Sequence, residues 1–196
     1  MKKIIVLLSF FCFSTHAQNI TVSSGTSFTI EKTGSVTASG NFSNSGTFTM
    51  ASDPNEFSSL IVDGTSSGNI TYNRYVNTQG TNEWDLVGSP VDGLSISSFV
   101  TDNSSAIAMS GTTYALGYYD NSNDSWTNYT NSTVGGAGNL TLGKGYQMAS
   151  ASGSTMAFTG TVATSAQTQS VINNADNGGR RWNLVANPFP SYINLN

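Results

Sequence analysis

One short apolar segment occurs twice in the chain, and it constrains the fold more than any other feature. Residues 84–90 read Trp-Asp-Leu-Val-Gly-Ser-Pro, and residues 182–188 read Trp-Asn-Leu-Val-Ala-Asn-Pro. In both copies Trp and Leu are two positions apart, which is the period of a β-strand with one large apolar face. Proline then ends the strand, because it has no N–H to donate to a neighbouring strand. We therefore interpret the repeat as structural, and its members are Trp84, Leu86, Pro90, Trp182, Leu184 and Pro188.

Residues 1–17 have the pattern of a secretory signal peptide. Lys2 and Lys3 precede an apolar run at residues 4–13, and Ala17 offers a cleavage site before Gln18. The apolar run is far shorter than the ~20 residues that a membrane-spanning helix needs, and no later stretch is long enough. We expect export to the cell surface or the extracellular space, with no transmembrane segment in the mature chain.

Removal of this leader would limit the chemistry of the mature chain. The only cysteine, Cys12, and the only histidine, His16, would both be lost. Without Lys2 and Lys3, five basic residues remain against 11 acidic ones, a net charge of −6. An acidic, sparsely charged chain is a poor partner for nucleic acid or anionic lipid. Catalysis would have to use carboxylates alone, and we expect no cofactor.

The rest of the chain predicts an all-β protein in two parts. In residues 18–56, short alternating stretches are separated by glycines, a pattern typical of a β-solenoid or of a meander of short strands. In residues 57–181 the strands become longer, and turn signals recur at the spacing of a β-sandwich or jelly roll. Residues 94–100 could form one or two helical turns. Residues 182–196 would begin a second repeat unit.

A group of aromatic residues is the best candidate for a binding site. Tyr118, Tyr119, Trp126 and Tyr129 lie on two stretches joined by a turn at residues 120–125. Rings that are exposed on a sheet can stack on sugar rings, whereas buried rings would only fill the core. Neighbouring residues of a strand point to opposite faces, so Tyr118 and Tyr119 cannot both be buried in the same core. Carbohydrate binding by these four side chains is therefore one hypothesis.

Two loop motifs come close to known ligand-binding patterns but miss an essential residue. Residues 138–145 approach the phosphate-binding loop, but Gly145 stands where a Ser or Thr should bind magnesium. Asp120, Ser122 and Asp124 place side-chain oxygens at alternate positions, as calcium-binding loops do. However, Ser125 replaces the expected glycine, and no Glu closes the loop. We interpret both as tight turns, and calcium binding at Asp120 and Asp124 stays an open question.

Charged residues near the first copy allow a third interpretation. Arg74 lies in an otherwise apolar series, and we expect it to pair with Asp63, Glu83 or Asp85; binding of a ligand is the alternative. Glu83, Asp85 and Asp92 could act together on glycosides, as carboxylate pairs do. The second copy has Asn183 in place of Asp85, so the acid is not part of the repeat. We expect no enzymatic activity.

The repeat also resembles a segment of large secreted surface proteins of Bacteroidota, which carry the motif WNLVGNPYPS. Residues 182–191 match that motif, and residues 72–76, 84–90, 143–146 and 158–160 follow the order seen there. The resemblance implies a type IX sorting domain, which usually ends such proteins, and it supplies no catalytic residue. This chain ends soon after its second copy, without that domain. We expect a truncated product or fragment, which would be periplasmic if that end is genuine.

The sequence thus favours a non-enzymatic extracellular or cell-surface module with a structural or adhesive role. The alternative is a carbohydrate-binding module that uses the exposed aromatics, and a glycoside-acting enzyme comes last. An extracellular glycan or a neighbouring surface protein is the expected partner.

Overall fold

The chain is all-β, as predicted, with one short α-helix. The computed structural model describes residues 18–80, 83–173 and 182–194. The elements in order are β1 (Ile20–Val22), β2 (Ser27–Ile30), β3 (Ser35–Ala38), β4 (Phe42–Asn44), β5 (Thr47–Met50), β6 (Ser59–Val62), β7 (Ser66–Ser67), β8 (Asn69–Val76), β9 (Asp85–Gly88), α1 (Ile96–Asp102), β10 (Met109–Ser110), β11 (Thr113–Asp120), β12 (Ser125–Thr130), the 3₁₀ turn Val134–Gly136, β13 (Gly145–Met148) and β14 (Ser154–Thr161).

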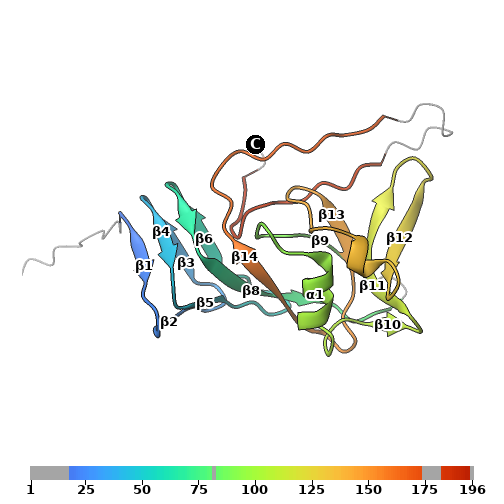
Figure 1. Ribbon diagram of the computed structural model, residues 1–196, viewed down its shortest axis with the longest axis horizontal. Helices are drawn as coiled ribbons and strands as arrows, with labels where there is room; N and C mark the ends of the chain where they lie inside the picture. Colours follow the sequence, from blue (N-terminus) through green and yellow to red (C-terminus); the bar gives the residue numbers. More distant parts are fainter. Residues whose placement is uncertain (1–17, 81–82, 174–181, 195–196) are drawn as a thin grey trace, which may run out of the picture.

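The first eight strands form a β-solenoid of three faces. Strands β1, β4 and β7 pair in parallel on one face, β2, β5 and β8 on the second, and β3 and β6 on the third. Figure 1 shows these strands side by side at one end of the molecule. Each parallel pair joins two strands that lie three places apart along the chain. This pairing identifies a solenoid rather than a meander, because a meander pairs consecutive strands antiparallel. The solenoid continues to β8, beyond residue 56, where the sequence suggested that the second part begins.

Each turn of the solenoid repeats the same corner. The side-chain oxygen of Asn19 accepts a hydrogen bond from the Asn41 N–H at 2.8 Å, and that of Asn41 accepts one from the Thr65 N–H at 2.9 Å. The interior is apolar, and the Phe42 and Phe48 rings meet edge to face at 5.0 Å. The repeated corner holds successive turns in register, so each turn can bury the apolar face of the one before it.

Strand β14 joins the solenoid to the rest of the chain. It pairs antiparallel with β8 along its full length, from Ser154 opposite Val76 to Thr161 opposite Asn69. The resulting sheet has the order β14-β8-β5-β2. Residues of β8, β11, β13 and β14 belong to the same core cluster as the solenoid interior, so the hydrophobic core is continuous.

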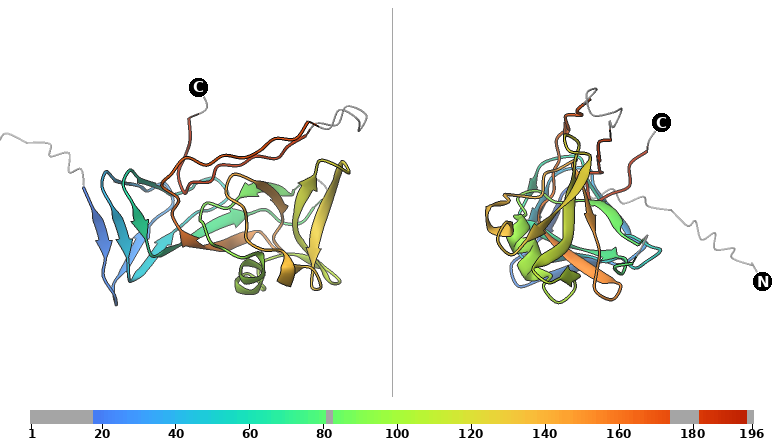
Figure 2. Two further views of the ribbon diagram at one scale, coloured as in Figure 1. Left: turned by 45° about the horizontal axis from the view of Figure 1, so that its top comes forward. Right: turned by 90° about the vertical axis from the view of Figure 1, so that its right-hand side faces the viewer.

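The second part is a curled sheet with one helix beside it. Its order is β10-β11-β13-β9, and β12 pairs with β11 as a hairpin. Helix α1 forms where a helical turn was expected, and the Ser95 hydroxyl accepts a hydrogen bond from the Ser98 N–H as its N-cap. Phe99 packs on Phe158 of β14 at 4.7 Å between ring centroids. The left view of Figure 2 shows the curled sheet at the end of the molecule opposite β1, with α1 between the two. In the described residues no helix is long and apolar enough to cross a membrane.

Candidate functional site

Both copies of the Trp motif lie against the same strand. The first copy forms β9, which pairs antiparallel with β13, Gly88 opposite Gly145. The second copy runs beside the residues that lead into β13: the Gly145 N–H donates to the Leu184 carbonyl at 3.0 Å, and the Ala186 N–H donates to the Gly143 carbonyl at 2.9 Å. The second copy therefore folds back onto the sheet of the first. In its described residues it makes one β-bridge, Val185 with Lys144.

The apolar face that the sequence predicted for the motif points outwards in the first copy. Val87 is buried in the core, Leu86 on the other side of β9 is 60% exposed, and Trp84 packs half-buried on a small alanine cluster. Strand β9 is an edge strand at the end of the curled sheet, and Val87 is its one buried residue. Pro90 does follow the end of the strand, as expected. In the second copy Trp182 is 75% exposed.

The path of the second copy depends on glycine in the first. A Cβ atom on Gly88 would overlap the Cβ of Ala186 and crowd the Asn187 carbonyl. We expect Gly88→Ala to displace residues 184–190 while the core persists. Amide hydrogen exchange at Gly145, Ala186 and Leu60, whose N–H donates to the Pro190 carbonyl, should then accelerate.

Gly135→Ala is the matched control, because its Cβ would meet nothing within 4 Å. Unchanged protection of the three amides in Gly88→Ala would show that the second copy is not held against β9.

The first of two adjoining hollows, here called the aromatic hollow, lies between the hairpin and the second copy. It has a volume of about 280 Å³ and is lined by Leu86, Tyr119, Trp126, Trp182, Asn183 and Leu184. Tyr119 and Trp126 are cross-strand neighbours whose rings meet nearly edge to face at 5.4 Å. Trp126 is 43% exposed. The buried Asn121 side chain donates to the Trp182 carbonyl and so ties the second copy to the hairpin.

The four predicted sugar-binding residues divide into two pairs. Tyr118 and Tyr129 contact each other, with 5.8 Å between ring centroids, and pack against the main core. Burial raises the pKa of the Tyr129 hydroxyl above its usual range. Tyr119 and Trp126 lie on the other face of the hairpin and line the aromatic hollow. The prediction that Tyr118 and Tyr119 point in opposite directions is thereby confirmed, and only the second pair lines the aromatic hollow.

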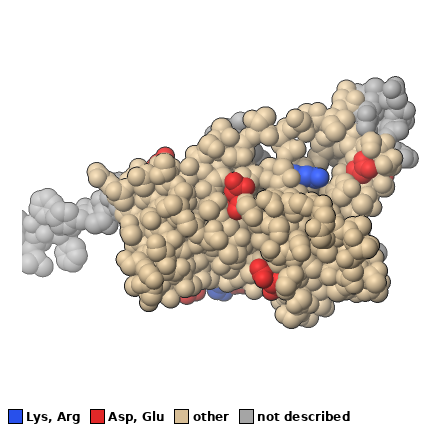
Figure 3. Space-filling view, viewed as in Figure 1, with Lys and Arg blue, Asp and Glu red and all other residues tan. Residues whose placement is uncertain are grey.

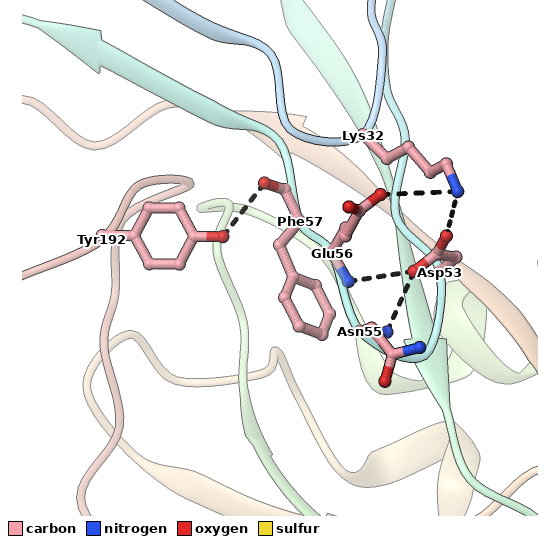
Figure 4. Close-up of polar contacts among 6 residues, drawn as sticks. All are labelled: Lys32, Asp53, Asn55, Glu56, Phe57 and Tyr192. Carbon is pink, nitrogen blue, oxygen red and sulfur yellow. Dashed lines mark hydrogen bonds and ion pairs between the residues drawn. The ribbon is translucent and has the colours of Figure 1, made fainter.

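The second hollow, here called the arginine cavity, lies on the other side of Leu86 and Leu184, which line both. Its volume is about 300 Å³, and its walls come from the loop before β6, from β8 and β9, and from the C-terminal segment. Arg74 lines it, and its guanidinium lies 4.0 Å from the centre of the Phe57 ring. The Tyr192 hydroxyl donates to the Phe57 carbonyl at 3.1 Å, which holds the C-terminal segment over this wall (Figure 4).

Arg74 does not form the ion pair that the sequence suggested. No carboxylate of the described residues lies within 4.0 Å of it, and its one hydrogen bond there goes to the Tyr75 carbonyl at 2.9 Å. Asp85 is instead held by Asn77, whose backbone N–H and side-chain amide donate to it at 2.9 and 2.8 Å. Burial lowers the pKa of the Arg74 guanidinium, and the nearby Tyr72 and Asp85 oppose that shift.

The carboxylates near the first copy do not converge on either hollow. Glu83 is exposed, Asp85 is bound to Asn77, and the Asp92 carboxylate accepts a hydrogen bond from the neighbouring Gly93 N–H at 2.8 Å. The described lining of both hollows contains no Asp or Glu. Charged residues are sparse on the face shown in Figure 3.

The two loop motifs fold as turns. Asp120 accepts hydrogen bonds from the Ser122 N–H at 3.0 Å and the Asn123 amide at 2.6 Å, and Asp124 accepts one from the Tyr119 hydroxyl. The described residues contain no group of three or more acidic, His or Cys side chains placed to hold a metal ion. Residues 138–145 turn through Gly143, at φ +77°, into β13, so no helix follows to bind a phosphate.

Comparison with known protein families gives one match, to a family described as "Domain of unknown function (DUF8693)", over residues 4–196. The chain belongs to this family. The comparisons with curated proteins and with solved structures gave no match. Membership of DUF8693 assigns no ligand, so the two hollows are judged on their own geometry.

Sequence reasoning missed the arginine cavity and the role of Leu86 and Trp182 in the aromatic hollow. The signal was the run Pro188-Phe-Pro-Ser-Tyr192, because a second copy followed by two prolines and two aromatics suggests an extended segment packed on a surface. Where that segment packs follows from contacts with residues more than 100 positions earlier, such as the Tyr192 bond to Phe57.

Proposed function

We propose that this DUF8693 chain is a non-enzymatic extracellular or cell-surface adhesive module that binds carbohydrate in the aromatic hollow. The observation that carries the proposal is the pair of exposed indoles, Trp126 and Trp182, in one apolar hollow. Flat, partly exposed rings offer a sugar ring an apolar face to stack on. The absence of acidic residues from the described lining supports binding without turnover.

The proposed location rests on the sequence. The signal-peptide pattern of residues 1–17 and the resemblance to secreted Bacteroidota surface proteins both support export, with type IX secretion as the proposed route. A neighbouring surface protein is the second candidate partner, because Val171, Ile172 and Ile193 are exposed apolar residues.

Replacing Trp126 by alanine should weaken carbohydrate binding about tenfold, a loss of about 1.4 kcal/mol. The side chain is partly exposed at the hairpin surface, so the fold should persist. Affinity electrophoresis in gels that contain different soluble polysaccharides would identify the glycan that retards the wild type, and titration of Trp fluorescence would give the affinity. Trp182→Ala should have a similar effect.

Phe28→Ala is the matched control, because this partly exposed aromatic lies in the solenoid, outside both hollows. Equal affinity of wild type and Trp126→Ala for every polysaccharide would refute the proposed site. Retention by a purified surface protein but by no polysaccharide would favour the second candidate.

A further inference from the structure

The arginine cavity holds a cation, Arg74, that forms no ion pair with a carboxylate of the described residues. The structure describes three basic residues, Lys32, Arg74 and Lys144. Lys32 pairs with Asp53 and with Glu56, the latter at 3.4 Å, at the edge of the solenoid (Figure 4). Arg74 and Lys144 have no described carboxylate within 4.0 Å and lie over aromatic rings instead. In an acidic chain, both unpaired cations thus lie beside the second copy of the Trp motif.

The position of Arg74 suits an anionic group rather than a structural ion pair. A guanidinium that loses water on burial is costly unless an anion or several acceptors replace that water. Arg74 donates to only one described acceptor, the Tyr75 carbonyl, and the Phe57 ring covers one of its faces. The planar guanidinium has five N–H donors, and two of them can bind a carboxylate or sulfate side by side.

Several other polar side chains in the cavity are hydrogen-bonded, whereas the buried Ser58 hydroxyl has no hydrogen-bond partner among the described residues. The Tyr72 hydroxyl donates to the Ser58 carbonyl at 3.1 Å, and the Tyr192 hydroxyl to the Phe57 carbonyl. Asn187 bonds the Ser191 carbonyl and the Phe189 N–H. Among the described lining residues, Arg74 bears the only charge, and its guanidinium keeps N–H donors for a ligand.

The two hollows adjoin, which links this cation to the aromatic site. Leu86 and Leu184 line both the aromatic hollow and the arginine cavity. Leu86 is well exposed, so a chain of sugar rings stacked on Trp126 and Trp182 can pass over it towards Arg74.

We infer that the carbohydrate bound by this module is acidic, and that Arg74 binds its oxyanion group, a uronate carboxylate or a sulfate ester. The inference rests on the proposed function and names its ligand class. The net charge of the mature chain is negative, so the preference arises from contact with Arg74 and not from long-range attraction.

The test compares charged and uncharged forms of the same glycan by isothermal titration calorimetry. The probes are oligogalacturonate with its methyl ester, and a sulfated galactan oligosaccharide with its desulfated form. Wild type should bind at least one charged form about tenfold more tightly than its neutral counterpart, and added salt should reduce that preference. Which pair shows the preference distinguishes carboxylate from sulfate.

Arg74→Gln should abolish the preference, so that the charged and neutral forms bind with the same affinity. Arg74→Lys, which keeps the charge but loses the paired donors, should retain only part of it. Lys32→Gln, the same loss of charge at a paired surface cation, should behave as wild type. Trp126→Ala should lower the affinity for the charged form and for the neutral form by the same factor.

Equal affinity for charged and neutral forms in the wild type, or a preference that survives in Arg74→Gln, would overturn the inference. In that case binding of the neutral forms would leave the proposed function standing. Absence of binding to every saccharide would overturn both. The wild-type comparison keeps the test decisive even if Arg74→Gln fails to fold.

Discussion

Replacing Phe158 by alanine should lower the free energy of unfolding by about 4 kcal/mol, as expected for a large aromatic removed from a well-packed core. Phe158 is 0% exposed, lies opposite Tyr72 in the β14–β8 pair, and packs on Phe99 of α1. One side chain thus joins the last turn of the solenoid to the helix of the second part. A loss of this size is a large share of the ~5–15 kcal/mol that stabilises a typical protein.

Urea denaturation followed by circular dichroism would measure the effect. Phe28→Ala makes the same chemical change at a position that is 38% exposed, and it should cost much less. Because Phe28 is stacked on Phe48 at 5.1 Å, a small loss is still expected. Similar midpoints for the two variants would mean that β14 does not tie the two parts together.

The second large effect is expected for Gly68→Ala, which should prevent the last turn of the solenoid from stacking. Gly68 has φ +78°, and a Cβ atom there would overlap the backbone carbonyl oxygen of Asn44 in the turn below. Asn44 also donates from its side chain to the Asn69 carbonyl at 2.5 Å, so the two turns are joined at this point. Because the added Cβ would meet a backbone atom, no side chain can move aside to relieve the overlap. Strand β7 and the start of β8 must therefore shift.

Gly25→Ala separates this clash from simple backbone strain. Gly25 has the same φ of +78°, but nothing lies within 4 Å of the added Cβ. It should cost roughly 1–2 kcal/mol, the penalty of the left-handed conformation for a residue with a side chain. Gly68→Ala should cost several kcal/mol more, measured by thermal and urea unfolding, and equal costs would show that φ alone explains both glycines.

Local sequence patterns were sufficient for the elements whose signal lies within a few residues. Gly-punctuated alternation predicted short strands, and the β11–β12 hairpin follows the turn chemistry of Asp120, whose carboxylate bonds the next residues of the turn. The expected helical turn formed because Ser95 caps it. The opposite directions of Tyr118 and Tyr119 follow from the period of a strand. In the hairpin turn and the helix cap the stabilising partners are neighbours in the chain.

Only the tertiary structure decided which residues far apart in the sequence come into contact. Three features depend on which segment covers the edge strand β9: the exposure of Leu86, the unpaired guanidinium of Arg74 and the folding back of the second copy. The local sequence pattern does not specify which segment that is. Arg74 was expected to find a carboxylate nearby in sequence, but Asn77 holds Asp85 and Phe57 covers the guanidinium instead. The sequence by itself therefore determined an all-β chain that contains two copies of one Trp segment. Packing decided that one of them is an edge strand, that the other lies beside it, and that an aromatic and a cationic hollow lie on either side of the pair.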